Sequence, residues 1–267
     1  MTDPASRRTA ARPDPGVTIP QRIAALGPFF VFETHGPAAA AVPWRGMGEL
    51  LDDPAVLGER IGAVRGYLAA GGGQGVEAVE LRVAASVTHL GLVSRLISPS
   101  FAVAVLAGAV LPYGLREARW QPTLGGMFPL SLPDRVPVPV ADPVERAARL
   151  GSELFDGPVR ELVAAVGGYS VAPQILWGNV ASAVNGAVSA IARTAPELTG
   201  QARDFATMVL DQPHLRGTCT MAADGTGFRR RSCCLIYRAA PGRAGGLCGD
   251  CVLTAPVRTR PPDAVRG

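Results

Sequence analysis

A stretch of 31 residues, 162–192, carries no charged side chain, and this feature limits the possible folds of the 267-residue chain more than any other. A membrane span needs about 20 predominantly apolar residues. This stretch instead contains paired glycines, a proline and several Gln, Asn and Ser residues, and a second apolar stretch, 96–115, is interrupted by Pro99 and Pro112. We therefore expect buried helices and no transmembrane span, while peripheral contact with a membrane stays open.

Glycine and proline, with 32 and 24 residues, make up more than a fifth of the chain. Because both residues interrupt helices, this composition predicts many turns and broken helices. Apolar residues account for 48% and charged residues for 18%, which is typical of a globular protein. The sequence predicts a mainly α (α+β) fold, with a helical body, a small antiparallel sheet and a cysteine-rich C-terminal lobe.

Local patterns place the individual elements. Asp52-Asp53-Pro54 predicts a helix start, with the helix ending near Ala70. Apolar residues at three- and four-residue steps predict a helix from about Val79, which we expect Ser98-Pro99 to stop. Further helices are expected over 101–111, from Asp142-Pro143 and again after Gly157-Pro158, over 174–193 and over 197–210. Short strands are expected over 29–32, 116–120 and 127–132, with a hairpin of 218–221 and 228–231 around Asp224-Gly225.

Charge and residue usage exclude several classes of enzyme. All 26 basic residues are arginines, so mechanisms that need a lysine amine, such as Schiff-base chemistry or the P-loop, are excluded. The segment 212–267 holds nine arginines and three acidic residues, whereas the rest of the chain has a net charge of −2. No secretory signal is visible at the N-terminus, so we expect a cytoplasmic protein, in which clustered cysteines indicate metal or redox chemistry.

Four of the five cysteines form one pattern, Cys233-Cys234 followed after thirteen residues by Cys248-Gly249-Asp250-Cys251. Two thiolates separated by two residues can share a metal ion, and a second pair completes a four-sulfur site. Consecutive side chains of a strand point to opposite faces, so the vicinal pair can serve one centre only where the backbone kinks. A binuclear iron–sulfur cluster eases this geometry. Structural zinc, reduced thiols without metal and a vicinal disulfide are the alternatives.

Positive charge surrounds this pattern. A 2Fe–2S centre with four thiolates has a formal charge of about −2 when oxidised, and its charge is one unit more negative when it is reduced. Nearby arginines would offset that charge and raise the reduction potential, although they favour a metal without selecting iron over zinc. These arginines are Arg229, Arg230, Arg231, Arg238 and Arg243.

The residues around the cysteines resemble a known family. The segment 230–238 (RRSCCLIYR), followed by 248–251 (CGDC), resembles the C-terminal motif of FhuF-like ferric-siderophore reductases. Upstream, 94–99 (SRLISP) and 176–182 (LWGNVAS) resemble segments of actinobacterial members. The resemblance implies a 2Fe–2S cluster held by all four cysteines of the pattern and one-electron reduction of a cytoplasmic ferric siderophore, with release of Fe²⁺. The metal ligands would be Cys233, Cys234, Cys248 and Cys251.

This interpretation divides the chain and names further residues. We expect a disordered tail (1–17), a helical body that faces the siderophore (18–211), an iron–sulfur-binding lobe (212–254) and a second tail (255–267). No catalytic residue is expected beyond the cluster. The tentative substrate-binding residues are Arg95, Ser98, Trp177, Asn179, Arg230 and Arg231. Cys219 is expected to face about Arg230 as a plain thiol.

The expected partners are a ferric siderophore and a separate electron donor, a ferredoxin or a reductase. No Gly-x-Gly-x-x-Gly follows a strand, so a nicotinamide or flavin site within this chain is not expected. Nucleic acid is not expected either, because aromatic residues do not alternate with the arginines. Two alternative functions stay open, a zinc-stabilised non-catalytic binding module and an iron–sulfur redox sensor or shuttle.

Overall fold

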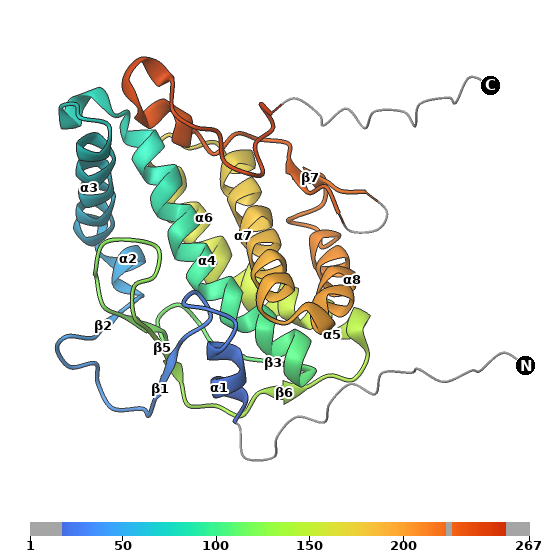
Figure 1. Cartoon of the computed structure of the whole chain (residues 1–267). Helices are drawn as coiled ribbons and strands as arrows, with labels where there is room; N and C mark the ends of the chain where they lie inside the picture. Colours follow the sequence, from blue (N-terminus) through green and yellow to red (C-terminus); the bar gives the residue numbers. More distant parts are fainter. Residues whose placement is uncertain (1–17, 223–225, 255–267) are drawn as a thin grey trace, which may run out of the picture.

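The computed structural model describes residues 18–222 and 226–254, and helices dominate it (Figure 1). The predicted tails 1–17 and 255–267 and the turn at Asp224-Gly225 lie outside the described residues. The α-helices are α1 (Ile19–Ala24), α2 (Glu49–Asp52), α3 (Pro54–Gly71), α4 (Leu81–Ala107), α5 (Pro143–Leu150), α6 (Arg160–Gly167), α7 (Pro173–Thr194) and α8 (Thr199–Leu210). The 3-10 turns are η1 (Val76–Ala78), η3 (Pro196–Leu198), η4 (Ile236–Ala239) and η5 (Pro241–Arg243), and η2 (Gly151–Val159) is a π-type segment. The mainly α fold class is confirmed.

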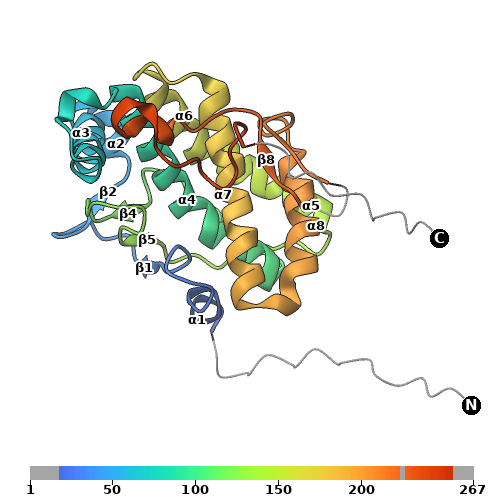
Figure 2. The ribbon, with the colours of Figure 1, turned by 45° about the horizontal axis from the view of Figure 1, so that its top comes forward.

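Helix α4 lies at the centre and packs along α7, with α3 and α8 on either side of this pair (Figures 1 and 2). The side chains of α4 are buried along almost its whole length, and its middle and C-terminal turns include Leu92, Leu96 and Phe101, each at most 1% exposed. The start of α3 is capped as the sequence predicts, because Asp53 Oδ1 accepts a hydrogen bond from the Ala55 amide at 2.9 Å. The predicted helix over 174–193 is also confirmed, as α7.

The prediction that Ser98-Pro99 stops a helix is wrong, because α4 continues through Pro99 to Ala107. Proline removes a backbone donor and crowds the preceding turn, so carbonyls there need other partners. The hydroxyls of Ser100 and Tyr113 both donate to the Leu96 carbonyl, at 2.9 and 3.2 Å. These side-chain donors support the helix where the proline disturbs it, and the separate helix expected over 101–111 is the C-terminal part of α4.

Both central helices are long and apolar enough to cross a membrane by length and composition alone. Of the apolar 18-residue stretch in each helix, 72% is buried inside the protein in α4 and 56% in α7. A core helix of a soluble protein passes the same test, so this finding is weak support for a membrane span. Packing of α4 against α3, α7 and α8 accounts for its apolar surface.

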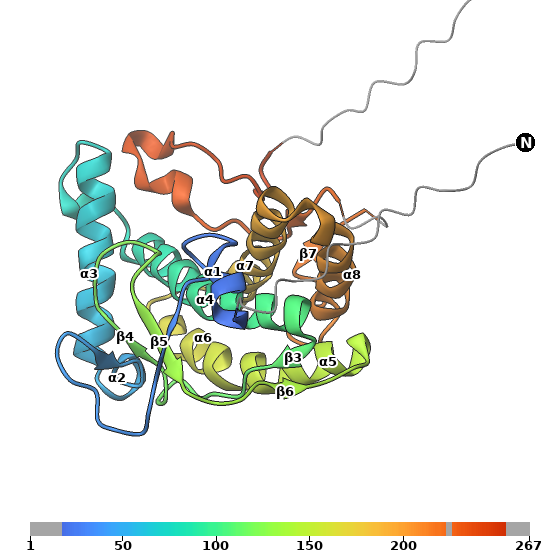
Figure 3. The same ribbon diagram turned by 60° about the horizontal axis from the view of Figure 1, so that its bottom comes forward.

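The strands are short, and β7 lies beside α8, away from β1, β4 and β5 (Figures 1 and 3). One sheet has the order β1-β5-β4-β2, with β1 parallel to β5 and the other pairs antiparallel. Its strands are β1 (Glu33–His35), β2 (Arg45–Gly46), β4 (Arg119–Trp120) and β5 (Leu130–Pro133); β3 (Ala109–Val110) pairs with β6 (Val138–Pro139), and β7 (Cys219–Thr220) with β8 (Arg229–Arg230). Strands are thus present at β4 and β5 and in the hairpin, close to where they were expected.

The strand predicted over 29–32 is wrong, because residues 29–30 form a turn, 31–32 have no regular structure and β1 begins only at Glu33. Arg95 of α4 explains the difference. It is 2% exposed, and its guanidinium donates to the carbonyls of Phe29 at 2.6 Å, Val31 at 2.8 Å and Phe128 at 2.9 Å. A buried guanidinium thus takes backbone acceptors that a neighbouring strand would otherwise use.

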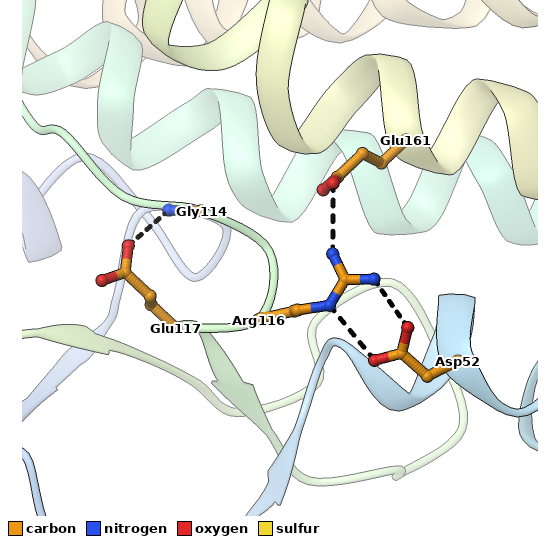
Figure 4. A network of polar contacts seen from close by, with 5 residues as sticks. All are labelled: Asp52, Gly114, Arg116, Glu117 and Glu161. Atoms are coloured by element: carbon orange, nitrogen blue, oxygen red, sulfur yellow. Dashed lines mark hydrogen bonds and ion pairs between the residues drawn. The ribbon is translucent and has the colours of Figure 1, made fainter.

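A surface network links α2, α6 and the turn that precedes β4 (Figure 4). Arg116 forms an ion pair with Asp52 at the end of α2, at 2.6 Å, and another with Glu161 of α6, at 3.3 Å. Beside it, the Glu117 carboxylate accepts from the Gly114 amide at 2.8 Å. The network fixes the turn that precedes β4.

Candidate metal centre

The vicinal cysteines follow β8 after two residues, and the backbone kinks immediately beyond them. Leu235 has a φ of +70°, a left-handed conformation that is costly for a leucine. Its side chain is 9% exposed and packs with Ala69, Val79 and Val83 in a small apolar cluster beneath the lobe. Burial of this side chain supports the strained conformation, and the backbone turns sharply directly after the vicinal pair.

The four thiols are gathered as two pairs. Cys234 Sγ lies 3.5 Å from Cys248 Sγ, and the Cys251 side chain interacts with the thiol of Cys233 and helps to raise its pKa. Within residues 18–222 and 226–254, no three His, Cys, Asp or Glu side chains are close enough together to hold a single metal ion. Two sulfur pairs suit a binuclear centre, in which each iron takes two protein sulfurs, better than a mononuclear zinc site.

A backbone amide two positions further along the chain faces each of the four sulfurs. The pairs are Leu235 with Cys233 (3.3 Å), Leu253 with Cys251 (3.4 Å), Ile236 with Cys234 and Asp250 with Cys248. Hydrogen bonds to sulfur stabilise thiolate over thiol and also tune the potential of an iron–sulfur centre. The backbone is therefore arranged for four anionic sulfurs.

The Cys234–Cys248 pair shares its protons unequally. The hydrogen bond between the two thiols lowers the pKa of Cys234 to about 6 and raises the pKa of Cys248. Burial raises the pKa of Cys233.

A buried arginine lies beside the sulfurs. Arg230 of β8 is 1% exposed, and its Nη2 donates to the Ile175 carbonyl at 3.1 Å, while its buried Nε and Nη1 have no partner. Its charge interacts with Cys234, Cys248 and Cys233. Buried donors without acceptors and a buried positive charge are both unfavourable unless an anionic group lies beside them. The residues present therefore fit a dianionic 2Fe–2S centre.

Helix α7 contacts the lobe at Gly178 and through a hydrogen bond from Ser232. A Cβ atom at Gly178 would lie 2.3 Å from Ser232 Oγ and 3.0 Å from Arg230 Nη2. Ser232 donates to the Gln174 carbonyl at 2.8 Å, so the chain next to the vicinal cysteines rests directly on the helix. Gly178 was part of a segment that the resemblance singled out, but its role as the contact point of the lobe was not predicted.

Asp250, in the second half of the cysteine pattern, also joins the lobe to α7. Its carboxylate accepts hydrogen bonds from Ser182 Oγ and from Asn185 Nδ2, the latter at 3.1 Å, and its carbonyl accepts from the Arg230 amide at 3.0 Å. Sequence reasoning missed this anchor. The polar residues on one face of an otherwise apolar helix were the signal that could have found it.

Asn179 forms a buried link between the two central helices and the lobe. It is fully buried and donates through Nδ2 to the Ser86 carbonyl at 3.0 Å, and Ser86 Oγ donates to the Cys234 carbonyl at 2.9 Å. His89 is also fully buried and contacts Asn179 at 3.4 Å. Asn179 thus has a structural partner on α4 and lies behind the cysteines.

A cavity of about 890 Å³ lies between α3, α4, α7 and the loops after α1 and β4. Apolar side chains form most of its wall, and hydroxyls of Ser94, Ser98 and Ser182 add polar points. Ile236, two residues after Cys234, also lines it, so the cavity reaches the cysteine lobe. A pocket of this size and lining suits a small organic ligand.

The six predicted substrate-binding residues all lie in the described ranges, and Ser98 is the one that lines this cavity. Arg95 braces the cavity wall from behind through the backbone carbonyls described above. Trp177 stacks on His214 with ring centres 4.5 Å apart, and Arg231 is exposed at the end of β8 with its amide bound to the Thr218 carbonyl. Substrate contact therefore stays a prediction, and Ser98 is its best-placed candidate.

Cys219 is separate from the four paired thiols. It lies on β7 directly opposite Arg230 of β8, as expected from the hairpin. Burial raises the pKa of its thiol, and it packs against the main apolar core. A protonated thiol in apolar packing is a poor metal ligand.

These features define a cysteine-ligated iron–sulfur protein. Residues 230–253 match the family model of the FhuF 2Fe-2S C-terminal domain, which is consistent with an FhuF-like family and indicates a 2Fe–2S cluster as the cofactor. The match covers the lobe and not the helical body. No curated protein matches the chain.

The buried histidine behind the centre predicts a pH dependence of stability. Burial, followed by the charge of Arg230, lowers the pKa of His89 from 6.5 to about 3. Below pH 6.5 the unfolded chain therefore binds a proton that the folded protein does not, so stability is complete above this pH and falls as the pH drops. Between pH 7.5 and 5.5 this single group costs about 1 kcal/mol.

Urea unfolding of the protein and of His89→Gln at the two pH values measures this contribution. The variant should lose about 1 kcal/mol less than the native sequence over the same interval. Equal losses would show that His89 is not held neutral in the folded protein.

Proposed function

We propose that this chain reduces ferric siderophores by one electron and releases Fe²⁺. A bound 2Fe–2S cluster supplies a centre that takes up and passes on a single electron. Support comes from the FhuF 2Fe-2S match, which concerns an iron–sulfur siderophore-associated protein, and from the cavity beside the lobe. The observation that carries the proposal is Ile236, which lines the cavity and whose amide faces the Cys234 sulfur.

The chemistry explains why a cavity and a cluster suffice. A siderophore binds Fe³⁺ through hard oxygen donors, and Fe²⁺ is softer and bound far more weakly. One electron from the cluster to the ferric ion therefore frees the metal, and the chelator leaves intact. We propose that this takes place in the cytoplasm and that a separate ferredoxin or reductase supplies the electron.

The cavity lining favours complexes of low charge. Among the described residues that line it, the charged ones are Arg60 and Arg193, and none is acidic. Arg60 uses its donors on the carbonyls of Thr123 and Gly125, which leaves Arg193, exposed near the end of α7, for an anionic group. A complex with several negative charges would be poorly compensated here, so neutral tris-hydroxamate complexes should react faster than tris-catecholate complexes.

The direct test mixes dithionite-reduced protein, freed of excess reductant, with a ferric siderophore and a ferrous chelator under anaerobic conditions. We expect the cluster to be reoxidised and about one Fe²⁺ to appear per reduced cluster. If reoxidation is no faster than without siderophore, the protein is a redox sensor or shuttle and the proposal fails.

Filling the cavity should separate substrate binding from cluster assembly. Gly186 of α7 lines the cavity, and a Cβ there would meet nothing within 4 Å, so Gly186→Phe places a ring in the open space. We expect the apparent Kd for the ferric siderophore to rise at least about tenfold, which corresponds to about 1.4 kcal/mol, while the cluster spectrum is unchanged.

Gly62→Phe is the matched control for this variant. Gly62 lies on α3, is exposed, has open space around it and does not line the cavity. The control should bind the siderophore as the native sequence does. Equal binding by both variants would place the substrate elsewhere.

A further inference from the structure

Arg230 differs from the other buried arginines of the described chain in how its donors are used. Arg60, Arg95 and Arg146 are each less than 9% exposed and direct their guanidinium groups to backbone carbonyls. Arg230 directs one nitrogen to a carbonyl and leaves Nε and Nη1 buried without an acceptor. A donor pair of this kind points to an acceptor that the polypeptide itself does not provide.

Among the described residues, Arg230 also forms no ion pair with a carboxylate. Within 18–222 and 226–254, the ion pairs of the structure do not include Arg230, whereas Arg238 and Arg243 of the same lobe both pair with Glu80, at 2.7 and 3.3 Å. Asp250, the nearest acid in the lobe, is turned to Ser182 and Asn185 of α7. The charge of Arg230 interacts with the sulfurs of Cys234, Cys248 and Cys233 as well as with the Asp250 carboxylate.

The position of Arg230 is fixed by the elements on both sides. Its amide donates to the Asp250 carbonyl at 3.0 Å, so the backbone of Arg230 is held to the segment between Cys248 and Cys251. Its guanidinium lies against Gly178, where a Cβ would come within 3.0 Å of Nη2 and 3.4 Å of Nε. The absence of a side chain at Gly178 therefore leaves room for the guanidinium of Arg230.

We propose that Arg230 is the buried counter-charge of the 2Fe–2S cluster, and that its Nε and Nη1 donate hydrogen bonds to sulfur atoms of the cluster. Reduction adds one negative charge to the centre, and a fixed cation nearby stabilises the reduced form more than the oxidised form. Arg230 therefore raises the reduction potential and makes the cluster easier for a physiological donor to reduce. This inference rests on the cluster and not on the identity of the substrate.

The test compares the midpoint potentials of Arg230→Met, Arg230→Lys and Arg238→Gln in cluster-loaded protein, by redox titration followed by EPR, without any siderophore. At a fixed solution potential, Arg230→Met should lower the ratio of reduced to oxidised protein at least about tenfold, which equals a shift of about 59 mV for one electron. Arg230→Lys keeps the charge and should shift the potential less. Arg238→Gln, an arginine with its own carboxylate partner, should change it little.

An unchanged potential in cluster-loaded Arg230→Met would overturn the proposal. If that variant does not retain a cluster, thermal unfolding of the metal-free proteins decides. There Arg230 is a buried charge without its anion, so Arg230→Met should unfold at a temperature equal to or above that of the native sequence. A lower unfolding temperature would mean that Arg230 only packs the lobe, and the proposal would fail. Because no siderophore is present, neither result bears on the reductase activity.

Discussion

Replacement of Cys234 by serine abolishes the iron–sulfur centre, and the purified variant should be colourless and contain less than about a tenth of the native iron. Cys234 is the sulfur whose pKa is lowered to about 6, and it pairs with Cys248 at 3.5 Å. A serine hydroxyl is not deprotonated near neutral pH and is a poor ligand for iron in such a site. Visible absorption and iron analysis of anaerobically purified protein measure the loss.

Cys219→Ser is the matched control for this substitution. Its thiol lies on β7, outside the two sulfur pairs, and burial raises its pKa. The variant should keep the native iron content and visible spectrum. Loss of the cluster in Cys219→Ser, with the cluster retained in Cys234→Ser, would overturn the ligand assignment. Like Cys234→Ser, the variants Cys233→Ser, Cys248→Ser and Cys251→Ser are expected to lose the cluster.

Gly178→Val is expected to separate the cysteine lobe from α7. The added atoms would overlap Ser232 Oγ, which a Cβ alone approaches to 2.3 Å, and would push Arg230 away from the sulfurs. Overpacking of this kind costs about 1–3 kcal/mol, and here the cost falls on the contact that positions the vicinal cysteines. We expect the cluster to be lost at least about tenfold faster on exposure to an iron chelator, as followed by visible absorption.

Gly186→Val provides the control on the same helix. A Cβ at Gly186 meets nothing within 4 Å, and the β-branched side chain carries the same cost for the helix at both positions. The control should release iron at the native rate. Similar chelator sensitivity of the two variants would mean that the close approach at Gly178 does not hold the lobe.

Local patterns predicted most of the helices because their signals are short-range. Asp53 caps α3, and Asp142 accepts a hydrogen bond from the Glu145 amide at 2.8 Å at the start of α5. The failure at Pro99 has a long-range cause, since Tyr113 reaches the carbonyl of Leu96 from outside the helix. Propensity alone cannot anticipate a tertiary donor of this kind.

The cysteine spacing predicted a backbone kink near the vicinal pair, and Leu235, directly after the pair, has a left-handed backbone, while the set of four cysteine ligands stays a prediction. The supports of the site were not predictable in the same way. Gly178 and Asp250 act through contacts between segments about 50 to 70 residues apart in sequence, and no local signal marks such a contact. Arg95 was expected at a substrate and instead braces the cavity wall, because burial among carbonyls cannot be deduced from its neighbours in sequence.

Iron and acid-labile sulfide analysis, combined with EPR of the dithionite-reduced protein, shows whether the cysteines of the lobe hold a 2Fe–2S cluster. We expect about two iron ions and two sulfides per chain, with about one unpaired electron per chain after reduction. Colourless protein with about one zinc ion per chain and no EPR signal after reduction would contradict it.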